Sequence, residues 1–383
     1  MTRPGGPLRE LGPALKVCLG AGIPGLAPLT LTASDVAPDA GEIMSEGLAP
    51  VALKVLRVGT DVTERRLRDR FARVAMVQEL RSLAAESTLE RITGILAPAG
   101  ICFVVIKGPA VARLHPEGWP RPYADIDLLV EPQRFPEAMM LIQEQGYTYP
   151  STSQPPWPWF DRYCREGLNL GGAGDVDVHH HVAPWIFGTR VRSIDVIHGA
   201  EVVRVRDSLV PMASPEHSTV IAALHVLNDL WKGQRGLVSW RDLIILTRRL
   251  GGHRVRAAFD DAGLGWLFDL VVGAVQQYLP GLLDNIECGP AKIPLRYAWR
   301  MRGLGWERST PLSRQRLAWA IRLPIPQAGA FVAGSGLPSR RYIRARHGSY
   351  REYWRQAWVE ALSTFSGADH RMDKKDTAPT SRA

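Results

Sequence analysis

Residues 101–130 read ICFVVIKGPAVARLHPEGWPRPYADIDLLV, and the two aspartates near the end of this stretch are its most informative feature. Asp125 and Asp127 alternate with apolar residues, which predicts a β-strand that carries both carboxylates on one face. Their backbones then lie about 7 Å apart, and at an effective dielectric of about 20 the charges repel each other by roughly 2–3 kcal/mol. A divalent cation removes this repulsion, and Mg²⁺ prefers oxygen ligands. The pair therefore indicates metal-assisted phosphate chemistry.

Two features on either side of this pair support the same chemistry. The apolar run 101–106 predicts a buried strand that ends at Lys107 and Gly108. A glycine at a strand end lets backbone N–H groups approach a phosphate closely, and the lysine supplies a point charge. Further along, Asp177 lies on another predicted strand, where it can complete a metal site or take a proton from an attacking hydroxyl. Asp175 shares the same strand face and is the rival for this role.

Several motifs follow one another in a set order along the chain. They are Lys107-Gly108, Arg121 before the DIDLLV block at 125–130, Gly146-Tyr147, and Val176-Asp177-Val178-His179. Residues 224–246, LHVLNDLWKGQRGLVSWRDLIIL, add a histidine and a W-x-D-L motif. Over about residues 62–270 these motifs resemble the uncharacterised bacterial nucleotidyltransferase family of the polymerase-β superfamily.

The resemblance implies an α+β fold, in which a polymerase-β-like core with a small mixed sheet flanked by helices is followed by a helical domain. It implies an enzyme that transfers a nucleoside monophosphate from an NTP to a hydroxyl acceptor and releases pyrophosphate. Mg²⁺ is the expected cofactor, with Mn²⁺ as the alternative. The acceptor stays open among protein or peptide, RNA and small molecule, and the oligomeric state stays open as well.

The resemblance also implies roles for particular residues. The carboxylates expected to bind metal and to act in catalysis are Asp125, Asp127 and Asp177. The residues expected to bind nucleotide phosphates are Lys107, Gly108 and Arg121. His179 is expected to support Asp177 from outside the metal site.

The chain departs from the superfamily pattern at two places. Lys107-Gly108-Pro109 stands where better-studied members have Gly-Ser or Gly-Gly, so a serine that touches phosphate is missing. His180 replaces the usual aromatic residue after the V-D-x-H motif, a change expected to affect packing. A zinc site at the three consecutive histidines 179–181 needs further ligands that the sequence does not supply. His225 and Asp242 are expected to stabilise the helical part, with lining of the cleft as the lesser alternative.

The pattern along the chain predicts four regions. Residues 1–60, rich in Gly, Pro and Ala, are expected to be a mobile or loosely packed extension that can include short helices. Residues 61–212 are the predicted catalytic domain: one long helix or two short ones up to Pro98, the two strands above, a helix over 135–145, and a hairpin around the glycine-rich turn 171–174. Residues 213–365 are predicted to be a helical, basic, Trp/Arg-rich domain that begins at Ser214-Pro215. Residues 366–383 are predicted to be a disordered tail.

Composition bounds the other possibilities. The 383 residues carry a net charge of +9, and the positive charge is concentrated between Lys292 and Arg355. This segment either favours polyanionic partners or forms a solvated basic face without a partner. No apolar run reaches the length of a membrane span, and four widely spaced cysteines suit a reducing cytoplasm. Two alternatives to the enzyme remain at this point: a degenerate, antitoxin-like binding or regulatory module, and an RNA-binding protein without catalysis.

Overall fold

The structure is a computed structural model. It describes residues 11–23, 30–57, 62–148, 167–182 without Ala173, 191–231 and 235–294, together with the segment 349–355 and isolated positions outside these ranges. Most of the basic segment and the predicted tail 366–383 lie outside the described residues.

A six-stranded mixed sheet forms the centre of the α+β core, with the strand order β3-β4-β2-β1-β6-β5. Its strands are β1 (Phe103–Val105), β2 (Asp125–Val130), β3 (Gly167–Leu170), β4 (Asp175–His179), β5 (Glu201–Val205) and β6 (Ser208–Met212). Strand β2 runs antiparallel to β1 and parallel to β4, and the β2–β4 register places Asp127 beside Asp177. The central strands are short and apolar because both of their faces are covered.

The two faces of the sheet pack against different layers. Ile126, Leu128 and Val130 of β2 point into a core shared with helices α6 (Val62–Leu96) and α8 (Phe135–Glu144). Leu129, which has the opposite parity, belongs to a second core shared with the helical half. Asp127 has the parity of Leu129, so the acidic residues lie on the face that is turned toward the helical half.

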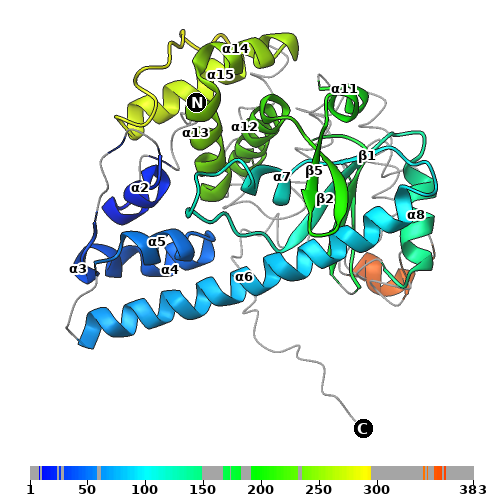
Figure 1. Cartoon of the computed structure of the whole chain (residues 1–383), viewed down its shortest axis with the longest axis horizontal. Helices are drawn as coiled ribbons and strands as arrows, with labels where there is room; N and C mark the ends of the chain where they lie inside the picture. Colours follow the sequence, from blue (N-terminus) through cyan, green and yellow to red (C-terminus); the bar gives the residue numbers. More distant parts are fainter. Residues whose placement is uncertain are drawn as a thin grey trace.

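Among the described residues, the helical half comprises α12 (Pro215–Trp231), α13 (Leu237–Leu250), α14 (Gly252–Asp261) and α15 (Gly265–Tyr278), and these helices lie next to the sheet (Figure 1). The short helices α7 (Pro109–Ala112) and α11 (Ser193–His198) complete the elements around the sheet. Helix α12 begins as predicted, because the Ser214 hydroxyl accepts a hydrogen bond from the His217 amide at 3.2 Å. The fold class is therefore as expected, a sheet-containing core with a helical region after it.

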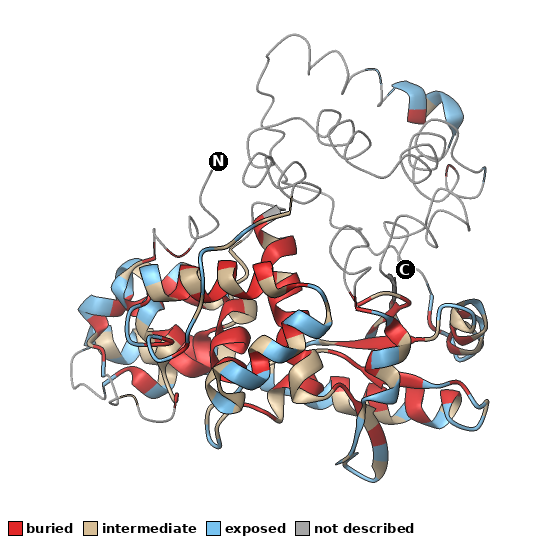
Figure 2. Ribbon diagram, turned by 90° about the horizontal axis from the view of Figure 1, so that it is seen from above, coloured by how far each residue is buried: buried red, intermediate tan, exposed pale blue. Residues whose placement is uncertain are grey.

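The N-terminal region differs from its prediction as a loosely packed extension. It forms α2 (Pro13–Gly20), α3 (Ala33–Val36), the 3₁₀ helix η1 (Ala37–Asp39), α4 (Ala40–Ser45) and α5 (Ala49–Val55). Leu15, Cys18 and Ile43 are fully buried in the same core as the helical half, and buried residues run continuously through these layers (Figure 2). Such short helices carry too few turns for a clear 3.6-residue period, so the sequence allowed short helices here but showed neither their positions nor their packing.

Helix α6 is a single helix of 35 residues that runs from the N-terminal helices to the sheet (Figure 1). The predicted helix over 135–145 and the β3–β4 hairpin are also present, and Gly146 follows α8 with the positive φ of +87°. The antiparallel β5–β6 pair had not been predicted. Among the described helices, none combines the length and the apolar character that crossing a membrane requires.

Candidate active site

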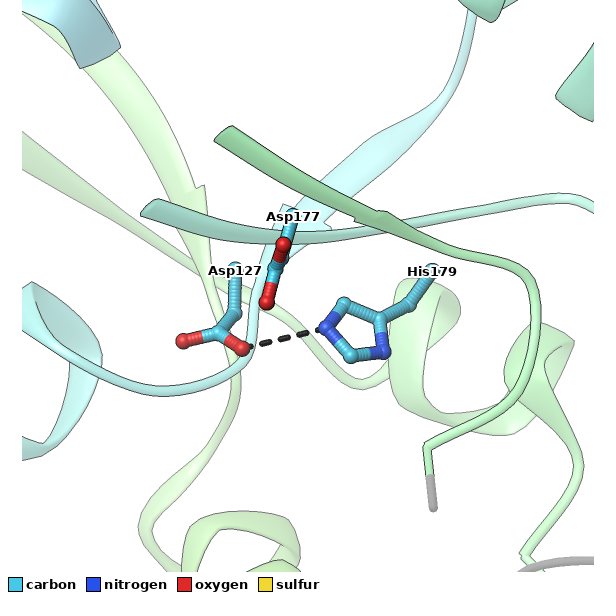
Figure 3. A group of neighbouring side chains, drawn as sticks. All are labelled: Asp127, Asp177 and His179. Carbon is cyan, nitrogen blue, oxygen red and sulfur yellow. Dashed lines mark hydrogen bonds and ion pairs between the residues drawn. The ribbon is translucent and has the colours of Figure 1, made fainter. Parts of the chain in front are cut away.

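Three ligand-bearing side chains converge on the sheet face that is turned toward the helical half. Asp127 lies in β2, and Asp177 and His179 lie two residues apart in the neighbouring parallel strand β4. One ligand atom from each of them lies within 4.8 Å of the others. Figure 3 shows the two carboxylates side by side and the imidazole turned toward Asp127. The register of the two strands therefore builds a compact cluster from residues 50 positions apart.

Asp127 is buried, with 4% of its surface exposed, and two donors compensate its charge. Lys107 Nζ donates to its Oδ1 at 2.7 Å, and His179 Nε2 lies 3.0 Å from the same oxygen. Burial alone would raise the pKa of Asp127, but the Lys107 charge and the His179 hydrogen bond hold it well below its usual range. Asp127 is therefore an anion whatever else occupies the site.

Asp177 is half-buried and has an unsatisfied oxygen. Its Oδ1 is shielded from solvent and has no hydrogen-bond partner. A buried carboxylate oxygen without a donor is costly unless a cation faces it. Because a second carboxylate and an imidazole lie within 4.8 Å, the residues fit a divalent cation, for which carboxylate oxygens are the preferred ligands.

Asp125 stands at the edge of this cluster. It is half-buried and lies opposite the exposed Asp175 in the β2–β4 register. Burial, followed by the charges of Asp127 and Asp177, raises its pKa to about 6, although Lys107 opposes the shift. Asp125 thus experiences the negative charge of the cluster without belonging to the group of three ligand atoms.

Lys107 and Gly108 come between β1 and α7. Gly108 adopts φ +49° and ψ −112°, a conformation that side chains with a Cβ rarely adopt. A Cβ at this position would lie 3.4 Å from the backbone oxygen of Asp125. The glycine therefore lets the chain turn directly behind the acidic strand and places Lys107 on Asp127.

Arg121, predicted to contact phosphate, lies against a carboxylate of the helical half. Its Nη2 donates to Asp242 Oδ2 at 2.8 Å, and its Nε lies 3.1 Å from the same oxygen. His115 Nε2 lies 2.9 Å from the other oxygen of Asp242. The sequence predicted that Asp242 stabilises the helical half, with lining of the cleft as the lesser alternative, and it did not single out His115.

Two of the histidine expectations can be compared with the structure. The hydrogen bond of His179 goes to Asp127, not to Asp177 as expected, because its ring reaches across from β4 to the neighbouring strand β2. His180, on the opposite face, is buried, and its ring centroid lies 4.7 Å from that of Phe135. His180 therefore contributes to packing, as expected for the residue that replaces an aromatic.

The mixed sheet thus presents a D-x-D strand, a third aspartate on the adjacent parallel strand and a Lys-Gly turn, which are the features on which the resemblance to a nucleotidyltransferase family rested. The model of a family described as uncharacterised nucleotidyltransferase matches residues 43–279, more than half of the chain. The chain belongs to this family and is a nucleotidyltransferase. The match covers both the sheet and the helices α12–α15, so the helical half is part of what defines the family. No curated protein and no solved structure matches the chain.

Proposed function

We propose that the protein is an Mg²⁺-dependent nucleotidyltransferase, with Mn²⁺ as the alternative ion, that transfers a nucleoside monophosphate from an NTP to a hydroxyl acceptor. The observation that carries this proposal is the cluster of Asp127, Asp177 and His179, in which a buried oxygen of Asp177 has no donor. The family supplies the nucleotide as the substrate class. The acceptor class stays open among protein or peptide, RNA and small molecule.

Asp125, Asp127 and Asp177 would hold the metal. When bound, a divalent ion neutralises the charge of the triphosphate and of the developing leaving group. In the transfer itself, the acceptor oxygen bonds to the α-phosphorus, the bond to the bridging oxygen of pyrophosphate breaks, and pyrophosphate leaves with that electron pair. Asp177, whose Oδ1 has no donor, serves either as a ligand of this ion or as the base that takes the proton of the acceptor hydroxyl.

The remaining site residues bind phosphate and hold the carboxylates. Lys107 is 23% exposed and can share its ammonium between Asp127 and a phosphate oxygen. Gly108 removes the bulk that would otherwise keep a phosphate from the backbone. His179 fixes the rotamer of Asp127 by donating its Nε2 hydrogen to Oδ1.

Transfer is tested by incubating each α-labelled NTP with Mg²⁺, cell extract and the full-length protein, with Asp127→Asn in parallel. We expect label on a discrete band or spot with the wild type, and a loss of at least a hundredfold in the variant. No transfer with any NTP, by protein that is folded, contradicts the proposal. Salt-dependent RNA binding that Asp127→Asn leaves unchanged would instead favour the RNA-binding alternative.

The metal site has its own test, which is independent of turnover. Titration calorimetry with Mn²⁺ is expected to show binding by the wild type and at least tenfold weaker binding by Asp177→Asn. Asp175→Asn is the matched control, because Asp175 lies two residues away on the same strand face but is exposed and outside the cluster. Equal affinity of Asp177→Asn and the wild type would place the metal elsewhere.

A further inference from the structure

A buried polar cluster joins the helical half to the loop that precedes the D-x-D strand. Asp242 of α13 is 3% exposed and accepts hydrogen bonds from Arg121 through Nη2 at 2.8 Å and Nε at 3.1 Å. The Nε2 of His115, which is also buried, lies 2.9 Å from the second oxygen of Asp242. Two cationic or polar groups from the loop therefore share one carboxylate from the helical half.

The guanidinium of Arg121 contacts Asp242 and also experiences the charges of the acidic cluster. Its side chain is 13% exposed. Burial alone would lower the pKa of Arg121, but the charge of Asp242, followed by those of Asp127 and Asp125, raises it overall. The cation is therefore close enough to the metal-site carboxylates to interact with them, although its hydrogen bonds go to Asp242.

The hydrogen bonds leave one edge of the guanidinium open. Nε and one Nη2 hydrogen face Asp242, and Nη1 donates to the Pro122 oxygen at 3.4 Å. One hydrogen on each Nη nitrogen then has no partner among the described residues. These two hydrogens form the end-on fork with which arginine binds phosphate bidentately.

The loop is also fixed from its other side. The hydroxyl of Ser82 in α6 accepts a hydrogen bond from the Tyr123 amide at 3.0 Å and donates to the Tyr123 oxygen at 2.9 Å. Tyr123 donates its own hydroxyl to Glu86, one turn further along α6, at 3.0 Å. Since its neighbour two residues later is held in this way, Arg121 has a defined backbone position, and Asp242 decides only where its guanidinium points.

We propose that Asp242 is a positioning residue for nucleotide binding: together with His115 it holds Arg121 side-on, so that the opposite edge of the guanidinium contacts the triphosphate. This inference rests on the proposed function and adds a role for the helical half within the same site. It also gives the W-x-D-L motif, in which Asp242 is the acidic residue, a physical reason.

The variant Asp242→Asn tests this proposal, because electrostatic repulsion and positioning predict opposite changes in NTP affinity. Replacing Asp242 by Asn removes a negative charge near an anionic ligand, so simple electrostatics expects tighter NTP binding. If Asp242 positions Arg121, the variant should bind NTP more weakly, because the guanidinium of Arg121 loses its orientation. Calorimetry with the full-length protein and the Mg²⁺ complex of each NTP measures the dissociation constant. We expect it to rise about tenfold in Asp242→Asn and by a similar factor in Arg121→Lys, which keeps the charge but loses the fork.

The second measurement is the coupling between Arg121 and Asp242 in NTP binding. The double variant Arg121→Lys/Asp242→Asn is expected to bind no more weakly than either single variant, since both remove one interaction. Arg249→Ala is the matched control: Arg249 also lies on α13 and donates to the Leu114 oxygen of the same loop at 3.0 Å, but it does not touch Arg121. We expect its dissociation constant to stay within twofold of the wild type.

The outcomes separate this inference from the proposed function. Wild-type protein that binds no NTP overturns both. Wild-type binding together with a folded Asp242→Asn that binds equally or more tightly overturns the positioning role alone, and so does additive loss in the double variant. If Asp242→Asn does not fold, His115→Gln replaces it, with an expected rise of about threefold, and an unchanged dissociation constant again overturns the role.

Discussion

Asp125 and Asp127 lie two residues apart on one strand, yet their environments differ. Asp127 is buried and compensated by Lys107 and His179, which keep its pKa well below the usual range. Asp125 receives the repulsion of its neighbours without a direct donor from them, and its pKa rises to about 6. The pKa values of two residues with the same chemistry therefore shift in opposite directions, because compensation of a buried charge depends on which donors reach it.

The conformation of Gly108 gives a prediction at the residue scale. Gly108→Ala introduces a Cβ at φ +49°, which strains the backbone behind Asp125, and we expect a loss of about 1–3 kcal/mol in the free energy of unfolding. Urea denaturation measures this loss. Gly94→Ala is the control: Gly94 lies in α6 with open space around its Cβ position, so alanine should stabilise the protein by about 0.5–1 kcal/mol. Equal effects of the two substitutions would contradict the strain at Gly108.

At the scale of elements, contacts between α13 and the loop before β2 connect the helical half to the site. Leu246 of α13 packs against Val111 and Leu114, and Asp242 of the same helix bonds to Arg121, so α13 makes both an apolar and a polar contact with this part of the chain. Burial alone would raise the pKa of Asp242, but Arg121 and then His115 lower it to about 2. The pKa of His115 is lowered, chiefly by burial and further by the charges of Arg241 and Arg121. Asp242 opposes this shift.

These shifts predict how stability falls with acid. The pKa of Asp242 is lower in the folded protein than in the unfolded chain, so its contribution is present above about pH 4 and is lost as the pH falls toward 2. The contribution amounts to roughly 2 kcal/mol. The lowered pKa of His115 acts in the same direction below about pH 6.5, because the unfolded chain takes up the proton more readily.

Urea denaturation between pH 7 and pH 3 measures this effect in the wild type and in Asp242→Asn. At pH 7 the variant should lose about 3–5 kcal/mol, because the buried Arg121 is left without its partner. At pH 3 the difference from the wild type should be smaller, because Asp242 of the unfolded chain is then mostly protonated and folding must remove that proton. The same difference at both pH values would show that the Asp242 charge does not contribute.

At the scale of the whole molecule, the N-terminal helices belong to the body of the protein. Arg241 of α13 is buried, and its Nη1 donates to the oxygens of Cys18 and Leu19 near the end of α2, at 2.8 and 3.1 Å. The family match begins at residue 43, within α4, so it includes α5 but not α2 or α3. The boundary near residue 212 between a catalytic and a helical domain stays a prediction.

Removal of residues 1–60 tests this integration. The truncated chain is expected to aggregate or to lose cooperative unfolding, because the apolar residues of α12–α15 that pack on α2–α5 become exposed to water. Size-exclusion chromatography and thermal unfolding monitored by circular dichroism provide the measurements. A chain without residues 366–383, the predicted tail, is the control and should behave like the full-length protein. A soluble, cooperatively folding truncation at residue 61 would restore the view of a dispensable extension.

Local sequence patterns determined much of this protein on their own. Alternation placed Asp125 and Asp127 on one face of a strand, a glycine ended α8, and a serine began α12, because each feature depends only on residues a few positions apart. Local patterns also put Lys107 at the end of a strand and Asp177 on another strand. The resemblance to a family then grouped both residues with the acidic strand.

Only the tertiary structure decided which side chains meet. The bond of Arg121 to Asp242 joins residues 121 positions apart, and that of His179 to Asp127 joins residues 52 apart across two parallel strands. The N-terminal helices became visible only through the core that they cover. Pairings of this kind depend on strand order, register and the packing of whole layers, and no short window of sequence contains that information.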